Sequence, residues 1–394
     1  MSTVVNTAAE ASPTSPAPVP FLDLRAQSAE IADEVLQSWR EQLLAAAFVG
    51  GAEVEAFENE YATYIGTAHC VGISNGTDAL ELAYRAVGVG PGDEVIMPGN
   101  TFIATAEAAS RIGAVPVFVD VDEEHLLIDP DAAAAAITAR TRAIVPVHLF
   151  GQTAPVELLR PLAAKYDLAI VEDAAQAQGA SGPAGRAGTL GDIAATSFYP
   201  GKNLGAAGDA GAVTTDDPRL AAKVRMLQAH GSLVKYEHEQ VGVNARLDAV
   251  QATFLRAKLR RLEAWNEARR RAAAAYADLL SDIAGVRVPS PRSGNTDVWH
   301  LYVTRVNGRD RIVDQLRTAG IGTGIHYPTP VHLTSAYAHL GYRRGQLPVA
   351  EAAARSLLSL PMFPHLRLEQ QIVVRDAVRA AAVLCEPTRE GRRA

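Results

Sequence analysis

The sequence predicts an α/β protein with a mostly parallel, mixed sheet, and two observations lead to this prediction. Between about residues 50 and 215, short apolar runs alternate with amphipathic stretches. Strands that alternate with helices in this way form a parallel sheet covered on both faces. The length of 394 residues is typical of two or more domains. We expect a disordered tail at 1–20, a large domain at 21–260 and a smaller α+β domain at 261–394.

The first half of the chain supplies most of the predicted sheet. In the segment 53–65, Val54, Phe57 and Tyr61 recur every three or four positions, which predicts a helix. Two further amphipathic helices are expected, at 77–87 and 101–112. Short apolar runs predict strands at 70–74, 94–98, 116–121, 142–149 and 168–173, followed by two more at 194–199 and 210–215.

The second half begins with a long helical pattern. Residues 246–281 contain no Gly or Pro, so we expect one long helix that links the two domains. Its basic run, 255–271, alternates charges with Leu259, Leu262 and Trp265, which predicts a solvated helix face. The segments beyond it give the rest of the chain an α+β character, with a strand at 298–305 and helices at 308–320 and 368–384.

Composition argues against several classes of protein. A net charge of -7 and a pI near 5.8 argue against nucleic-acid binding, and no apolar run approaches the roughly 20 residues of a membrane helix. The N-terminus lacks the basic start and apolar core of a signal peptide. Cys70 and Cys385 form no CxxC pair, which fits the reducing cytoplasm. We therefore expect a cytoplasmic protein that binds neither nucleic acid nor membranes.

A single lysine, Lys202, lies in the glycine-rich segment TSFYPGKNLGAAGDAGAV at 196–213. One interpretation is a surface lysine in a flexible loop; the other is an amine that must reach a bound ligand. A lysine amine forms an imine with an aldehyde only when it is deprotonated, which desolvation favours. The segment is not a phosphate-binding Walker A loop, because Thr196 and Asn203 stand where that motif needs Gly and Ser or Thr.

Two other predicted strands end in residues that suit the same ligand. Gly76 and Thr77 follow the strand 70–74 and open a helix, which Thr77 can cap and whose N-terminus suits a phosphate. Asp173 ends the strand 168–173, and its carboxylate could pair with a cationic ring nitrogen or simply cap a helix. In open α/β sheets, ligands bind at the carboxyl ends of the strands. A phosphate cradle, an aspartate and a lysine in this order predict a pyridoxal phosphate enzyme, in which the aspartate keeps the pyridine nitrogen protonated.

Seven motifs in order strengthen this prediction. The sequence resembles the DegT/DnrJ/EryC1/StrS family of sugar aminotransferases, which have the aspartate aminotransferase fold (pyridoxal phosphate fold type I), from VPFLDL onward. Each motif is weak alone, but together they are specific. They are GISNGTDALELA, PGNTFIATAEA, VEDAAQAQGA, SFYPGKNLGA followed by GDAGAV, NARLDAVQA, HYPTPVH and SLPMFPHL.

The resemblance implies a role for each matching position. Lys202 matches the lysine that forms the Schiff base, and Asp173 matches the partner of the pyridinium nitrogen. Phe102 matches the aromatic residue that stacks on the cofactor ring, although it could instead be a buried helix aromatic. The remaining matches are Gln176 to the contact with the ring hydroxyl, and Gly76, Thr77 and Ser197 to the phosphate contacts. Asn244 matches a residue that reaches the phosphate of the neighbouring subunit, which implies a homodimer with shared active sites.

The resemblance also implies a substrate class. Tyr199, three residues before Lys202, is typical of members that aminate C-3 of dTDP-3-keto-6-deoxyhexoses for antibiotic amino sugars, with glutamate as the usual donor. His326 and Tyr327 match residues near the pyranose in that subset, although His326 could also be a packed loop histidine. No usual metal site has the spacing of His326, His332 and His339, so we expect no metal. Three alternatives stay open: C-4 amination, a non-catalytic regulator that binds the cofactor, and an aldolase or lyase acting on a small amino acid.

Overall fold

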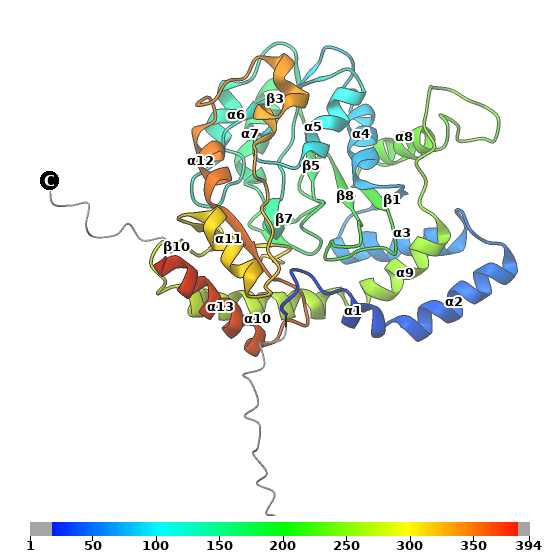
Figure 1. The fold of residues 1–394 in the computed structure, drawn as a ribbon. Helices are drawn as coiled ribbons and strands as arrows, with labels where there is room; N and C mark the ends of the chain where they lie inside the picture. Colours follow the sequence, from blue (N-terminus) through cyan, green and yellow to red (C-terminus); the bar gives the residue numbers. More distant parts are fainter. Residues whose placement is uncertain (1–17, 385–394) are drawn as a thin grey trace, which may run out of the picture.

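The computed structural model describes residues 18–384. Residues 1–17 of the predicted tail and Cys385 lie outside the described part of the chain. Val19 is buried, forms an isolated parallel bridge with Ile321 and donates its backbone N–H to the carbonyl of Gly320 at 3.1 Å. The described chain therefore begins as an ordered segment packed against the C-terminal part of the fold (Figure 1).

A seven-stranded sheet forms the centre of the molecule, in the order β1-β9-β8-β5-β4-β2-β3. All neighbouring pairs from β8 to β3 are parallel, whereas β9 is antiparallel to both β1 and β8. The mostly parallel, mixed sheet predicted from the sequence is confirmed. Its strands are β1 (His69–Ile73), β2 (Glu94–Pro98), β3 (Val115–Val119), β4 (Thr141–Ile144), β5 (Ala169–Asp173), β8 (Ile193–Ser197) and β9 (Gly211–Thr215).

Most of the helices before and between these strands pack against the sheet. Helix α4 lies against β8 and β9, and α7 lies against β4 and β5. The helices of this part are α1 (Arg25–Ala29), α2 (Ala32–Ala45), α3 (Ala52–Ile65), α4 (Gly76–Ala86), α5 (Ile103–Arg111), α6 (Pro130–Ala135), α7 (Val156–Tyr166) and α8 (Pro218–Gln228). A short hairpin of β6 (Ser181–Gly182) and β7 (Gly185–Arg186) follows β5.

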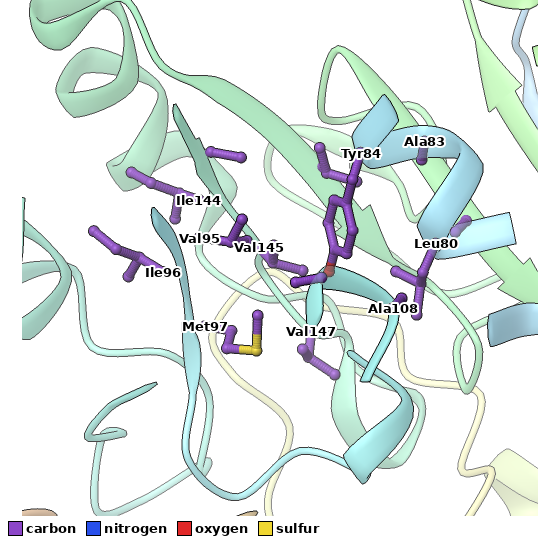
Figure 2. Close-up of a cluster of buried hydrophobic side chains, with 14 of the residues drawn as sticks. Leu80, Ala83, Tyr84, Val95, Ile96, Met97, Ala108, Ile144, Val145 and Val147 are labelled. Carbon is purple, nitrogen blue, oxygen red and sulfur yellow. The ribbon is translucent and has the colours of Figure 1, made fainter. Parts of the chain in front are cut away.

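The main apolar core lies between these helices and the sheet. Figure 2 shows Tyr84 and Leu80 of α4 directed toward Val95 and Met97 of β2 and toward Val145, which directly follows β4. The Tyr84 side chain is fully buried, and its hydroxyl donates to the backbone carbonyl of Thr105 at 3.0 Å. The fully buried strands carry continuous apolar runs because a parallel sheet is covered on both faces.

The C-terminal part has a second sheet and a second core. The strands β10 (Val286–Arg287), β11 (Tyr302–Val306) and β12 (Leu357–Leu360) form an antiparallel sheet, beside which α10 and α13 lie together (Figure 1). The helices here are α9 (Ala249–Leu259), α10 (Leu262–Leu280), α11 (Arg309–Thr318), α12 (Pro348–Ser356) and α13 (Leu368–Val383). Val331 and Leu347 contribute to the first core, so the division into domains at residue 260 stays a prediction.

The single long helix expected at 246–281 is wrong, because the chain breaks between α9 and α10 at Arg260 and Arg261. The Arg261 backbone N–H donates to the carbonyl of Lys258, and Nη1 of its guanidinium donates to the carbonyl of Ala257 at 2.9 Å. The side chain thereby replaces a hydrogen bond that the continuing helix would supply. No Gly or Pro marks this break, so the sequence pattern gave no signal for it.

The solvated face expected for 255–271 is also wrong in part. Several of its arginines form exposed ion pairs, such as Arg260 with Glu34 at 2.8 Å. Lys258 and Arg269, however, are only 4% and 1% exposed. Helix α9, which carries Lys258, is buried around most of its circumference, and Arg269 lies on the buried face of α10; a pattern of charges alone does not reveal this.

Candidate active site

A cavity of about 550 Å³ lies at the carboxyl ends of the parallel strands. Residues that follow β1, β2, β4, β5 and β8 line it together with residues of the C-terminal part. This is where a ligand is expected in an open α/β sheet. Ten of the eleven residues predicted for the site line the cavity: Gly76, Thr77, Phe102, Asp173, Gln176, Ser197, Tyr199, Lys202, His326 and Tyr327.

Asp173 is the last residue of β5 and is 6% exposed. Its Oδ2 accepts a hydrogen bond from Oγ1 of Thr105 at 2.7 Å, and its Oδ1 accepts the backbone N–H of Ala175 at 3.2 Å. The neighbouring Glu172 points into the interior instead, where it accepts three backbone N–H groups and faces His148 at 2.7 Å. The alternation of side chains along a strand therefore separates a structural carboxylate from one that faces the cavity.

Lys202 lies in the segment after β8, where its backbone N–H donates to the carbonyl of Tyr199 at 2.8 Å. Its amine has no hydrogen-bond or ion-pair partner in the described part of the chain. Burial lowers the pKa of this amine to about 8, and the charge of Asp173 opposes that shift. A larger fraction of the amine is therefore neutral at physiological pH than for an ordinary lysine.

The start of α4, at Gly76 and Thr77, lies close to Ser197 at the end of β8, and together these residues form a narrow cradle. A Cβ added at Gly76 would lie 2.6 Å from Cβ of Ser197, so only glycine fits there. The backbone N–H groups of Gly76 and Thr77 have no partner among residues 18–384. The helix N-cap is Asn75, whose Oδ1 accepts the N–H of Asp78 at 2.9 Å, so the prediction that Thr77 caps this helix is wrong. The free N–H groups at a helix N-terminus suit an anion such as phosphate.

Gln176, Tyr327 and Phe102 form one connected wall of the cavity. The Nε2 of Gln176 donates to the hydroxyl of Tyr327 at 3.1 Å, and its Oε1 accepts the backbone N–H of Phe150 at 2.7 Å. The rings of Tyr327 and Phe102 lie 5.5 Å apart at an interplanar angle of 38°. Phe102 is 52% exposed, so the alternative of a buried helix aromatic is wrong.

His326 reaches the cavity from the C-terminal part of the chain. Its Nδ1 lies 2.8 Å from Oγ of Ser359, and its ring stacks on Phe21 at 5.8 Å. Burial and, to a smaller extent, the charge of Lys202 lower the pKa of His326 to about 4. The imidazole is therefore neutral at physiological pH.

Asn244 is the one predicted site residue that does not line the cavity of its own chain. It is exposed and forms an isolated bridge with Ala229. This position neither supports nor contradicts a contact with a neighbouring subunit, so that role stays a prediction.

Sequence reasoning missed two residues that matter to the geometry. Thr105, within the motif that carries Phe102, donates to Asp173. His300 lines the cavity from the segment VWHLYVTR, which we interpreted only as a strand. A polar residue in an otherwise apolar run, as in this segment, was the available signal for His300.

These donors and acceptors fit pyridoxal phosphate. A carboxylate, an amine without a partner and two free backbone N–H groups in a glycine-walled cradle face one cavity. They match a cationic ring nitrogen, an aldehyde and a phosphate in turn. By contrast, residues 18–384 contain no group of three or more His, Cys, Asp or Glu side chains that could hold a metal ion, and His332 faces Glu351 at 3.3 Å. No helix in the described chain is long and apolar enough to cross a membrane.

Comparisons with known proteins point to one family. Residues 29–379 match the model of the DegT/DnrJ/EryC1/StrS aminotransferase family. The chain is 49% identical to the erythromycin biosynthesis sensory transduction protein EryC1 of Saccharopolyspora erythraea, over 92% of this chain and 100% of that protein. It is 48% identical to the dTDP-3-amino-3,4,6-trideoxy-alpha-D-glucose transaminase of Streptomyces venezuelae, over 92% of this chain and 95% of that enzyme.

Further similarities concern substrate names and fold. Three relatives that are 41% to 46% identical are named as sugar aminotransferases of dTDP- or UDP-linked 3-amino, 3-dehydro or 3-oxo sugars. The crystal structure of DesV from S. venezuelae, in complex with a ketimine intermediate, matches with a TM-score of 0.90 and 48% identity. That match covers 93% of this chain and 98% of DesV.

Proposed function

This chain belongs to the DegT/DnrJ/EryC1/StrS family of pyridoxal phosphate-dependent sugar aminotransferases, and from this premise we propose its reaction. We propose that it transfers an amino group from glutamate to C-3 of a dTDP-linked 3-keto-6-deoxyhexose, in the biosynthesis of a deoxyamino sugar. The observation that carries the proposal is one cavity that contains both the amine of Lys202 and the carboxylate of Asp173.

The residues of the cavity have distinct tasks in this reaction. When bound, pyridoxal phosphate supplies an electron sink at the carbon that exchanges its proton. Lys202 holds the cofactor through its amine and then moves that proton, which its lowered pKa allows near neutral pH. Asp173 holds a proton on the ring nitrogen, and the cradle at Gly76, Thr77 and Ser197 binds the phosphate.

The wall of the cavity orients the other groups. The Phe150 backbone and the Tyr327 hydroxyl hold the amide of Gln176 in a fixed orientation, and its second Nε2 hydrogen would be available to the ring hydroxyl. Phe102 covers the ring face. Tyr199, His326 and Tyr327 contact the sugar. Because two substrates use one site in turn, the kinetics are ping-pong.

A labelling experiment tests the covalent site. The protein is loaded with pyridoxal phosphate, reduced with borohydride, digested and mapped by mass spectrometry. We expect the label on Lys202. A label on any other lysine, with Lys202 unmodified, would overturn the assignment.

A substrate panel tests the regiochemistry. Four relatives at 41% to 48% identity have names that refer to position 3 of the sugar, which supports amination at C-3. Their names include both dTDP- and UDP-linked sugars. We expect dTDP-3-keto-6-deoxyhexoses to be aminated faster than 4-keto isomers and UDP analogues, with the product identified by NMR. Faster amination of a 4-keto sugar would replace this proposal with C-4 amination.

A second candidate, a regulator that binds the cofactor without turnover, is favoured by the name of the relative EryC1, a sensory transduction protein. The two candidates differ in one measurement. Glutamate should convert the bound cofactor of an aminotransferase into its amine form, which changes the absorption spectrum. A spectrum unchanged by glutamate would favour the regulator.

We also propose a homodimer with shared sites in the cytoplasm. Apolar side chains are exposed along α2 and the loop 230–243, among them Leu44 at 80% and Val241 at 87%, and such patches mark interaction surfaces. Asn244 follows this loop. Mixing inactive Lys202→Ala and Asn244→Ala proteins tests the sharing, because a hybrid dimer would regain one intact site. Activity that stays absent after subunit exchange would contradict shared sites. The proposed location in the cytoplasm is tested separately by cell fractionation.

A further inference from the structure

His300 lies in the same cavity and has no role in the reaction described above. It follows Trp299, whose φ of 47° places it in the left-handed region. The backbone here packs tightly on Gly151, because a Cβ added at Gly151 would lie 2.7 Å from the nitrogen of His300. The position of the His300 backbone is therefore closely constrained.

A chain of hydrogen bonds sets the tautomer of the His300 ring. Nδ1 of His300 lies 3.2 Å from Oδ1 of Asn203. Both hydrogens of the Asn203 amide are already used, since its Nδ2 donates to Oδ1 of Asn266 at 2.9 Å and to the carbonyl of Val298 at 2.8 Å. Asn203 can therefore offer only an acceptor to the ring, and Nδ1 of His300 carries the hydrogen.

The orientation of Asn266 supports the same assignment. Its Nδ2 donates to the backbone carbonyl of Gln178 at 2.9 Å, so its Oδ1 is the atom that faces Asn203. The chain thus runs from a backbone carbonyl, which can only accept, through two buried amides to the imidazole. Nε2 of His300 is left with a lone pair and has no partner among residues 18–384.

The surroundings keep this ring uncharged. Burial holds the pKa of His300 well below its ordinary value, and the charges of Lys202 and Arg269 lower it further. Lys202 and His326 face the same cavity, and His326 is also neutral. A neutral ring with hydrogen on Nδ1 offers its acceptor at Nε2 and no donor there.

We propose that His300 is a specificity-determining residue for the sugar: its Nε2 accepts a hydrogen bond from a hydroxyl of the sugar substrate, and it disfavours a carboxylate at the same place. This inference rests on the proposed function. Of the two proposed substrates, only the nucleotide sugar carries hydroxyl groups, and its hexose is the part that the proposed reaction brings beside Lys202. The carboxylates of glutamate can only accept hydrogen bonds, and the amine of glutamate is committed to the reacting carbon, so neither group of the donor suits this lone pair.

The two half-reactions separate this role from a general one. His300→Phe removes the acceptor, His300→Gln restores one, and His339→Gln is a matched change at an exposed histidine outside the cavity. In single-turnover experiments we expect His300→Phe to slow amination of the keto sugar by about tenfold, as for one lost hydrogen bond with its donor left unpaired. The reaction with glutamate should be unchanged, His300→Gln should recover part of the loss, and His339→Gln should match the wild type.

Calorimetry gives a second measurement that does not depend on turnover. The aminated nucleotide sugar and the nucleoside diphosphate alone are titrated into cofactor-free protein. We expect His300→Phe to weaken binding of the nucleotide sugar several-fold and to leave the nucleoside diphosphate unaffected. Thermal unfolding of each variant shows whether it is folded.

The outcomes distinguish the two levels of inference. If the wild type aminates no keto sugar, the proposed function itself fails and the role of His300 fails with it. If the wild type is active and His300→Phe matches it, or loses rate in the glutamate half-reaction, only the assignment of His300 is overturned.

Discussion

Two lysines of this chain differ in their surroundings although burial lowers the pKa of each to about 8. Lys202 lies after β8, lines the cavity and has Asp173 nearby. Lys258 lies on α9 and is 4% exposed, with its ammonium 5.6 Å from the ring centroid of Phe254 and 5.7 Å from that of Trp265. The first faces a space large enough for a cofactor, and the second is enclosed by aromatic rings.

The comparison shows that a lowered lysine pKa does not identify a site. Desolvation is the main cause in both places. Lys202 differs from Lys258 because it faces a cavity that also contains the carboxylate of Asp173 and the proposed phosphate cradle at Gly76. The rings beside Lys258 stabilise a cation in place, as cation–π contacts do. The predictions below test this difference, beginning with the largest effect.

Replacing Lys202 should abolish turnover, while replacing Lys258 should not. Lys202→Gln removes the amine that holds the cofactor and moves the proton, so we expect kcat to fall by roughly 10⁴-fold, the upper range for a positioned acid–base group. Lys258→Met should retain activity, because this side chain does not line the cavity. Steady-state kinetics of the two variants measure the contrast. Comparable losses in both would remove the distinction.

Replacing Asp173 should give the next largest effect. Asp173→Asn keeps the shape of the side chain but removes the charge that faces the ring nitrogen, so kcat should fall by roughly 10²- to 10³-fold. Glu172→Gln is not a matched control, because Glu172 holds three backbone N–H groups in the interior. The absorption spectrum of bound cofactor and kcat are both measured. A variant with wild-type kcat would contradict the role of Asp173.

The two lysines also show which features of the fold and of the site can be predicted from the sequence. The sheet follows from apolar runs of the kind seen in β2 and β5, because alternating strands and helices leave few topologies. Eight of the ten predicted residues that line the cavity, including Lys202 and Asp173, end or follow strands whose carboxyl ends lie together. The other two, His326 and Tyr327, come from the C-terminal part and were predicted only through the family resemblance. For Lys202 and its partners, order along the chain was enough to indicate proximity.

The helical half was harder to predict for a physical reason. The spacing of apolar residues identifies one face of a helix, but it does not show which other elements pack on that helix. Lys258 and Arg269 were therefore expected to be exposed to solvent, but both are buried. At the break, the Arg261 guanidinium pairs with the carboxylate of Glu34 at 2.6 Å, a residue far away in the sequence. His300 depends on amides of Asn203 and Asn266, which are distant from it in sequence. Each of these features depends on tertiary contacts.

Lys258 should affect stability in a pH-dependent way. Its pKa is about 8 in the folded protein and near the ordinary 10.5 when unfolded, so the folded state disfavours its charged form. Below pH 8 the lysine therefore destabilises the fold, and this penalty is relieved as the pH rises from 8 to about 10.5. At pH 7 we expect Lys258→Met to have a higher free energy of unfolding than the wild type. Removing the desolvation penalty should raise it by roughly 1 to 3 kcal/mol, and the loss of the two ring contacts should offset part of this gain.

Denaturant unfolding of the two proteins at several pH values measures this effect. The advantage of Lys258→Met should shrink between pH 8 and 10, since the wild-type lysine then loses its proton in the folded state. An advantage that is constant with pH would mean that packing, rather than charge, sets the difference. A Lys258→Met protein less stable than the wild type at pH 7 would show that the aromatic rings outweigh desolvation.

The smallest effect is expected at Thr105, which acts on the cavity only through Asp173. Its Oγ1 gives its hydrogen to Oδ2 of Asp173 at 2.7 Å, so the hydroxyl of Thr101, also at 2.7 Å, must donate to Thr105. Thr105→Val keeps the shape and removes both bonds. Because one hydrogen bond to a charged group is lost, kcat should fall by about tenfold. Thr105→Ser retains the hydroxyl and should recover most of the rate, whereas equal losses in the two variants would assign the effect to packing rather than to the orientation of Asp173.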